Sequence, residues 1–180
     1  DEPLSAYWVD PDIADDPRHE ALTLRLALSH QAGFPNWRYQ TDGRLQFRFD
    51  PGSNGSYSGE GYEYAARFAA ARTGQSFEEI VAREIITPLG LSATLTRDAQ
   101  YEADYAHPMI DGAFGEPSFQ AEASAADDLY ITVDSYARLL IAMIEDEALT
   151  PEIADLRERI IRDQRGAACR DGSPLAEVCP

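Results

Sequence analysis

The stretch Phe49-Asp50-Pro51-Gly52-Ser53-Asn54-Gly55-Ser56-Tyr57-Ser58-Gly59-Glu60-Gly61-Tyr62 is the segment around which the rest of this chain is organised. Its glycine, serine, asparagine and proline residues favour turns over regular elements. Residues 64–72 are almost all good helix formers, and Gly74 stands where a C-terminal stop belongs. We therefore expect Tyr57 on a tight loop that leads into a helix, a common way to place a polar side chain at the rim of a cleft. Taken alone, such a tyrosine is more often a half-buried packing residue.

Further short matches follow this loop in order. They are Pro51-Gly52, Tyr57-Ser58, Gly61-Tyr62, Thr73-Gly74 with Phe77, and Pro88-Leu89-Gly90-Leu91 with Thr94. This set resembles the serine β-lactamase and penicillin-binding-protein superfamily, on the class C β-lactamase and esterase side. In that family a Tyr-x-Asn motif lies between an upstream Ser-x-x-Lys and a downstream Lys-Thr-Gly or His-x-Gly. The resemblance implies that Tyr57 is a catalytic tyrosine that shuttles protons, and that Gly59 occupies the substrate-binding position where asparagine is expected.

The chain has no lysine, because all 15 of its basic residues are arginine. The motifs Ser-x-x-Lys and Lys-Thr-Gly are therefore both missing. Any mechanism that uses a lysine of this chain as a base or Schiff-base former is excluded. We expect residues 1–163 to be the helical part of a β-lactamase-like domain, whose remaining part lies outside this chain. The expected fold class is mainly α, the helical subdomain of an α+β fold, with at most a short strand or hairpin.

The composition limits the classes of partner. Of the 180 residues, 44% are hydrophobic, which is typical of a folded globule, and the net charge is −17. A surface with 32 acidic residues repels phosphate backbones, so we expect no nucleic-acid partner. No apolar run is long enough for a membrane span. A small-molecule or peptide substrate is expected, with no cofactor.

The hydrophobic pattern predicts the remaining elements. Expected are a helix over 24–29 that is capped by Thr23 and has Leu24, Ala27 and Leu28 on one face, and a half-buried strand over 44–49. A helix over 76–86 is expected to open with a Ser76/Glu79 capping box, and residues 97–128 are expected to form a long loop. A helix over 132–145 is expected to turn Tyr136, Leu139, Leu140, Met143 and Ile144 toward the core, and Thr150 is expected to cap a further helix with Pro151 at its first position.

Other kinds of site find little support. The sequence Gly55-Ser56-Tyr57-Ser58-Gly59 has a tyrosine where a nucleophile elbow needs serine. His19, His30 and His107 do not have metal-ligand spacing, so we expect no metal. His30 belongs to a segment resembling the family's Leu-x-His-x-Ser-Gly-Leu-Pro, and a capping or packing role is expected for it.

The expected function is that of the middle portion of a serine hydrolase, acting by acyl transfer on an amide or ester, with this chain inactive alone. Gly59 removes an amide side chain, which favours an esterase or peptidase-like hydrolase over an efficient β-lactamase. The alternative is a non-catalytic binding or scaffold domain that keeps the hydrolase shell without its chemistry.

Residues 164–180 form a tail that holds both cysteines, Cys169 and Cys179, separated by Gly172 and Pro174. This spacing favours a disulfide-closed loop over two free thiols, and hence a periplasmic or secreted protein. We predict that the two cysteines are bonded in the mature protein. A thiol titration in denaturant without reductant should find no free thiol, and two reactive thiols would contradict the bridge.

Overall fold

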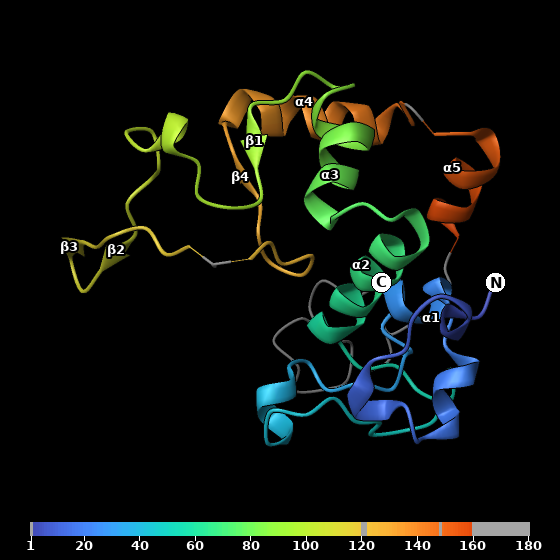
Figure 1. Cartoon of the computed structure of the whole chain (residues 1–180). Helices are drawn as coiled ribbons and strands as arrows, with labels where there is room; N and C mark the ends of the chain where they lie inside the picture. Colours follow the sequence, from blue (N-terminus) through green and yellow to red (C-terminus); the bar gives the residue numbers. More distant parts are fainter. Residues whose placement is uncertain (1, 120–121, 148, 160–180) are drawn as a thin grey trace, which may run out of the picture. The chain divides into compact units, whose positions relative to one another are not determined.

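The structure is a computed structural model that describes residues 2–119, 122–147 and 149–159, in two compact units (Figure 1). One unit comprises Asp1–Gly61 with the segment that begins at Leu149, and the other comprises Tyr62–Ala148. The boundary falls inside helix α2, which spans Gly59–Thr73. The predicted disulfide and the tail over 164–180 lie outside the described residues.

The first unit is built from short helices. They are the 3-10 helices Leu4–Ala6, Pro11–Ile13, Pro17–Ala21 and Arg38–Thr41, and the α-helices α1 (Leu24–Leu28) and α5 (Pro151–Glu158). The prolines explain this brevity, because each can begin a helix but cannot continue one. The side chains of Asp10 and Asp16 cap two of the turns by accepting the amide hydrogens of Asp12 and Arg18.

An apolar core of its own holds the first unit together. Its fully or almost fully buried members are Leu4, Ile13, Leu22, Ala27, Ala32, Phe34, Leu45 and Phe47. The rings of Phe34 and Phe47 lie 5.1 Å apart between centroids, and the Arg18 guanidinium covers the Phe47 ring. Burial of these side chains is the main stabilising contribution available to so short a set of helices.

The predicted strand over 44–49 is wrong as a strand, although its alternating burial is present. Leu45 and Phe47 are buried while their neighbours are exposed, as the pattern indicated. The segment has no strand partner among the described residues, and its amides bond elsewhere: Leu45 N–H donates to the Asp12 carboxylate and Arg48 N–H to the Gly33 carbonyl. Period-two burial therefore arises here without strand pairing.

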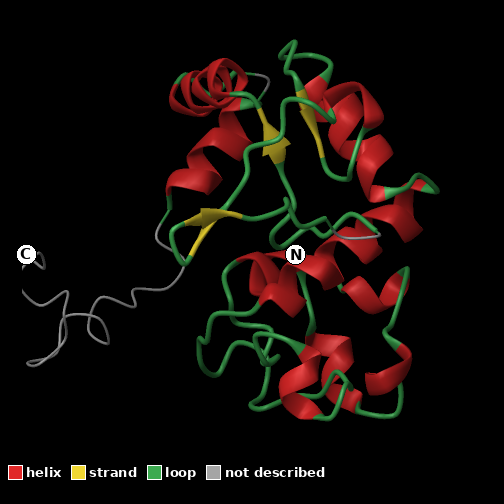
Figure 2. Cartoon of the chain, turned by 90° about the vertical axis from the view of Figure 1, so that its left-hand side faces the viewer, coloured by secondary structure: helices red, strands yellow, loops and turns green. Residues whose placement is uncertain are grey.

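The second unit combines the rest of α2 with α3 (Phe77–Val81), a π-helical turn (Ala82–Ile86) and α4 (Val133–Ile144). Its described residues also include a 3-10 helix, Ala99–Tyr101, and four two-residue strands (Figure 2). Strands β1 (Ala93–Thr94) and β4 (Tyr130–Ile131) pair antiparallel, with Ala93 opposite Ile131. The buried apolar side chains of this unit are Tyr64, Ala65, Ala66, Phe68, Leu95 and Ala142.

The expected long loop over 97–128 contains regular structure, and in this the prediction was wrong. Strands β2 (Met109–Ile110) and β3 (Ala113–Phe114) form a hairpin. Its two-residue turn is Asp111-Gly112, and both residues have positive φ, 50° and 81°. Aspartate followed by glycine is a preferred sequence for such a turn, since both central residues must adopt left-handed backbone angles.

The capping predictions are confirmed. Ser76 and Glu79 form the reciprocal capping box, and Thr23 and Thr150 each accept an amide hydrogen at the start of their helices. Thr132 caps α4 in the same way, a cap that was not predicted. Gly74 has φ of 70°, as expected for a helix stop.

The predicted core-facing stripe is wrong for α4, and the shared face predicted for α1 is only partly buried. In α1, Ala27 is buried while Leu24 and Leu28 are exposed. Helix α4 buries Ser135 and Ala142 and exposes much of its predicted core stripe, namely Tyr136, Leu140, Met143 and Ile144. Within the part of the chain that the structure describes, these four apolar side chains of α4 are thus left half-exposed or exposed.

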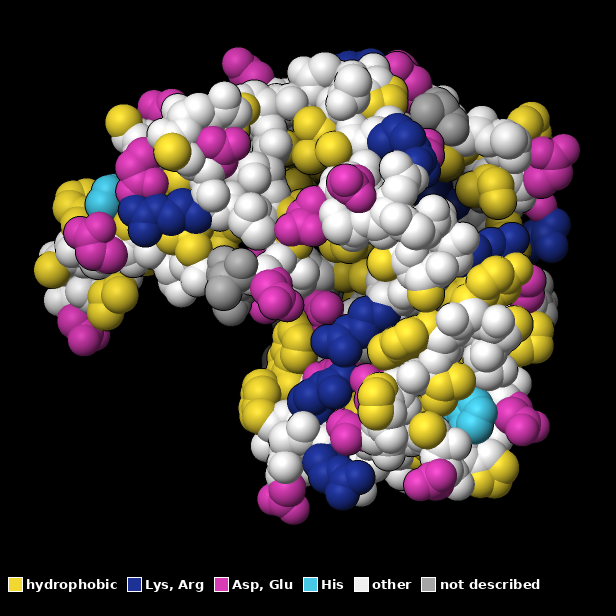
Figure 3. All heavy atoms as spheres, in the orientation of Figure 1, with side chains coloured by type: hydrophobic (Ala, Val, Ile, Leu, Met, Phe, Trp, Pro, Cys, Tyr) yellow, Lys and Arg dark blue, Asp and Glu magenta, His cyan; other side chains and the backbone are white. Residues whose placement is uncertain are grey.

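Acidic side chains are spread over the face drawn in Figure 3, with arginines among them, in keeping with the net charge of −17. None of the described helices has the length and apolar character that crossing a membrane requires.

Candidate active site around Tyr57

Helix α2 begins earlier than predicted, so Gly59 and Gly61 lie in its first turn and not in the preceding loop. The first amides of a helix have no partner within it. Here Ser58 Oγ accepts the Gly61 amide hydrogen at 3.1 Å, and Asn36 accepts two more, from Gly59 at its side-chain Oδ1 (2.9 Å) and from Glu60 at its carbonyl (3.0 Å). The start of α2 is therefore fixed by Ser58, which follows Tyr57, and by Asn36, which lies earlier in the chain.

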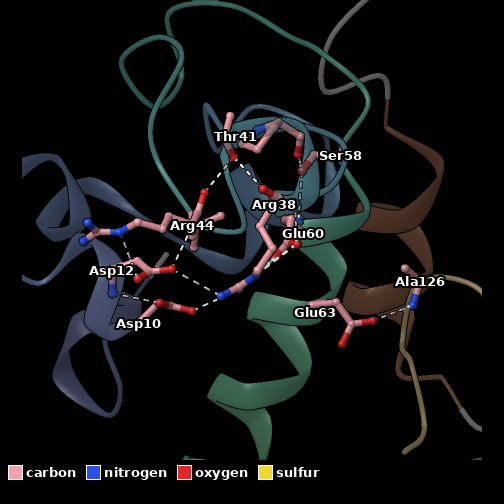
Figure 4. Close-up of polar contacts among 12 residues, drawn as sticks. Asp10, Asp12, Arg38, Thr41, Arg44, Ser58, Glu60, Glu63 and Ala126 are labelled. Atoms are coloured by element: carbon pink, nitrogen blue, oxygen red, sulfur yellow. Dashed lines mark hydrogen bonds and ion pairs between the residues drawn. The ribbon is translucent and has the colours of Figure 1, made fainter. Parts of the chain in front are cut away.

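A group of ion pairs around Arg38 attaches this helix start to the rest of the first unit (Figure 4). The Arg38 guanidinium bonds Glu60 through Nε and Nη2, at 3.1 and 2.8 Å, and reaches Asp10 at 3.1 Å. The side chains of Asp10 and Glu60 are 2% and 5% exposed, so both carboxylates are removed from water. The hydrogen bond to Glu60 raises the pKa of Arg38, which keeps the guanidinium charged.

Tyr57, the predicted catalytic residue, is 60% exposed, so it is not a core packing residue. Its ring lies 4.6 Å from the His30 ring between centroids. His30 accepts the amide hydrogens on both sides of Tyr57, that of Ser56 at its carbonyl (2.9 Å) and that of Ser58 at ring Nδ1 (3.2 Å). Burial lowers the pKa of His30, which favours the neutral ring that can accept at Nδ1. The packing role expected for His30 agrees with these contacts, and the catalytic role of Tyr57 stays a prediction.

Ser58 cannot serve as a nucleophile in this arrangement. Its side chain is only 1% exposed, and its Oγ donates to the Pro35 carbonyl at 2.7 Å while accepting from Gly61. A nucleophilic serine needs an accessible hydroxyl beside a base. The hydroxyl of Ser58 is instead a structural cap of α2.

Gly59 lies against the indole of Trp37. A Cβ atom at this position would come within 2.9 Å of the Trp37 ring, a distance that real side chains do not reach. The Gly59 amide is also occupied by Asn36. An asparagine here would have to displace Trp37, so the ring fills the space of the missing amide side chain. The structure gives Gly59 a packing role, and its substrate-binding role stays a prediction.

The second unit contains a pocket of about 750 Å³ that the sequence did not indicate. Three tyrosines, Tyr101, Tyr105 and Tyr130, contribute to its walls together with Ser92 and His107. The hydroxyls of the tyrosines have internal partners: Tyr105 accepts from Asp98 N–H, Tyr130 donates to the Ser118 carbonyl, and Tyr101 accepts from Ser92. The walls thus present mainly ring surfaces. Among the described residues, no cluster of histidine, cysteine and carboxylate side chains could hold a metal ion.

The sequence of the chain matches a known protein family. The model of the family described as Beta-lactamase matches residues 1–174. The chain therefore belongs to the β-lactamase family, as its resemblance indicated. Among curated proteins, none matches the chain.

Solved structures share the fold at low sequence identity. A D-stereospecific amidohydrolase from Streptomyces sp. is 16% identical with a TM-score of 0.74, over 92% of this chain and 59% of that one. D-Amino acid amidase from Ochrobactrum anthropi SV3, solved with D-phenylalanine, is 21% identical with a TM-score of 0.65, over 84% and 55%. Simvastatin synthase from Aspergillus terreus is 19% identical with a TM-score of 0.63, over 80% and 42%. The chain spans about half the length of these proteins.

We predict that Glu60→Ala lowers the free energy of unfolding by roughly 3 kcal/mol, because it breaks the buried ion pair with Arg38 and removes the carboxylate that accepts from the Arg38 amide and from its Nε. Denaturant unfolding of the chain measures this. The control is Glu20→Ala, since Glu20 is exposed in the same unit and its loss should cost less than about 0.5 kcal/mol. Equal effects of the two substitutions would contradict the role given to the Arg38 group.

We also predict that His30 makes the chain less stable below about pH 6.5, the ordinary pKa of histidine. Because the folded-state pKa is lowered, the unfolded chain takes up the proton first. Stability should therefore fall as the pH decreases from 6.5 to the folded-state pKa. The loss of unfolding free energy between pH 7.5 and 5.5 should be smaller in His30→Asn than in the native chain. An unchanged pH dependence in His30→Asn would show that His30 does not contribute.

Proposed function

We propose that this chain is the helical part of a serine hydrolase that works by acyl transfer on an amide or ester, with Tyr57 as its proton-transfer residue. The observation that carries the proposal is the fixed loop of Tyr57 within a chain of the β-lactamase family. The amidohydrolase and amidase among the structural relatives are consistent with it. The proposed fold class is the helical subdomain of an α+β domain.

The proposal assigns the nucleophilic serine and its lysine to a part of the protein outside this chain. The absence of lysine supports this, because serine activation in the family requires Ser-x-x-Lys. The exposed face of α4 supports it from packing. Val133, Tyr136, Leu140 and Ile144 recur at helical spacing and are 86%, 49%, 41% and 79% exposed. A contiguous apolar face of this kind is typical of a surface that another part of a protein covers.

The geometry of Gly59 bears on the substrate. The Trp37 ring lies where a Cβ at position 59 would be, so an asparagine side chain cannot extend from this position unless the ring moves. Losing a hydrogen-bonding group reduces discrimination in favour of substrates that need it. We propose an ester or peptide-like amide as substrate, in preference to a β-lactam. A periplasmic or secreted location is proposed with it.

We predict that the chain alone neither turns over nor becomes acylated by a penicillin or an activated ester, because it has no activated serine. Removing a nucleophile costs up to about 10⁶-fold in rate in a well-studied serine hydrolase. Mass spectrometry after incubation, together with turnover assays, measures both outcomes. A stoichiometric adduct on a serine with turnover would place the nucleophile in this chain and contradict the proposal.

The longer protein supplies the complementary test. There, Tyr57→Phe should reduce kcat by about 10²–10⁴-fold, since it removes a proton-transfer group. Tyr39→Phe is the control, as Tyr39 is an exposed tyrosine of the same unit. A longer protein that hydrolyses neither esters nor amides would favour a binding or scaffold domain instead.

A further inference from the structure

We propose that His30 is a positioning residue for Tyr57, which holds the main chain on both sides of the tyrosine and supports the phenol with its ring. This inference rests on the proposed function, which makes Tyr57 a proton-transfer residue. It concerns a contact between residues far apart in the sequence, because the Ser56 and Ser58 amides donate to the His30 carbonyl and Nδ1 at 2.9 and 3.2 Å.

The backbone of His30 makes this double acceptance possible. Its φ is 59°, in the left-handed region, which non-glycine residues adopt at a cost of roughly 1–2 kcal/mol. The residue follows Ser29, the C-cap of α1, and the bonds from His30 N–H to Ala27 and from Gln31 N–H to Leu26 continue the helix end through it. A strained conformation of this kind persists where the surrounding contacts determine it. We call the two hydrogen bonds from the Ser56 and Ser58 amides to His30 the clamp. The clamp is therefore anchored on the end of a helix, not on another loop.

The loop needs such an anchor. Gly52 has a positive φ of 80°, and residues 52–54 are exposed, so little apolar packing restrains them. The Gly52 amide donates to the Gln31 carbonyl at 2.9 Å, which makes it a third contact between the loop and this short segment. A proton-transfer group must lie within hydrogen-bond reach of its partner, and a misplacement of about 1 Å costs about 10²-fold in rate.

Two substitutions separate the acceptor from the backbone conformation. His30→Gly accepts the left-handed angle but has no ring nitrogen. His30→Asn also tolerates that angle and keeps an acceptor atom at the same position in the side chain. In both variants the His30 carbonyl remains, so the Ser56 amide keeps its acceptor.

Amide hydrogen exchange of this chain, followed by NMR, measures the clamp without any activity. We expect exchange at Ser58 to be about tenfold faster in His30→Gly and near the native rate in His30→Asn, because one hydrogen bond is lost and restored. The Gly52 amide is the internal control, since its acceptor is the Gln31 carbonyl. Exchange at Ser58 within twofold of the native rate in His30→Gly would overturn the proposal.

A measurement on the native chain remains decisive if His30→Gly does not fold. The ¹⁵N shifts of the His30 ring at pH 7.5 should show a bare Nδ1 and a protonated Nε2, because Nδ1 accepts the Ser58 amide hydrogen. A protonated Nδ1 would overturn the clamp.

Activity of the longer protein then links the clamp to the reaction. We expect His30→Gly to lower kcat about 10²-fold with little change in KM, and His30→Asn to recover most of the loss. Native kcat in His30→Gly would overturn the positioning role. If the longer protein has no hydrolase activity while the exchange results hold, the proposed function fails and the clamp stands as a structural contact.

Discussion

The amide groups at the start of α2 impose the constraint on which the structure around Tyr57 depends. A helix start leaves donors that must find partners when they are buried. Ser58 and Asn36 provide these partners, and Arg38 holds Glu60, the second residue of the helix, against Asp10. Because these bonds surround the residue after Tyr57, the tyrosine cannot move far without breaking a buried polar contact. The position of one exposed side chain is thus set by charges that are themselves almost fully buried.

Two glycines allow this arrangement by letting chain segments approach closely. A Cβ at Gly61 would lie 3.0 Å from the Ala27 carbonyl oxygen, so α2 packs directly against the end of α1. A Cβ at Gly33 would lie 2.3 Å from the Phe49 carbonyl oxygen, and its φ of 89° would strain any other residue. His30 lies between Ala27 and Gly33 in the sequence. These two close approaches therefore bring His30 within reach of the loop that carries Tyr57.

Local signals in the sequence predicted local structure well, and contacts between distant segments were not predictable. The caps at Thr23, Ser76 and Thr150 were predicted correctly because a cap needs only residues within one turn. The dipeptide Asp111-Gly112 is itself a local signal of a hairpin turn, although the segment around it was predicted as a loop. The family resemblance, carried by matches around Tyr57, was confirmed. The partners of that loop, above all Asn36, Arg38 and the two acceptors of His30, come from a segment more than twenty positions away, and no spacing rule connects them.

The prediction that the apolar face of α4 packs in the core of this chain was wrong, and the reason is physical. Periodicity identifies the face that a helix buries, but it does not say against what, and within the described chain α4 buries its small residues instead. Water contact with Val133 and Ile144 carries an unfavourable free energy that a covering surface would remove. The proposed reaction independently requires a lysine that this chain does not contain. One observation concerns packing and the other the proposed catalysis, and the remainder of a hydrolase domain, which we proposed to lie outside this chain, would satisfy both.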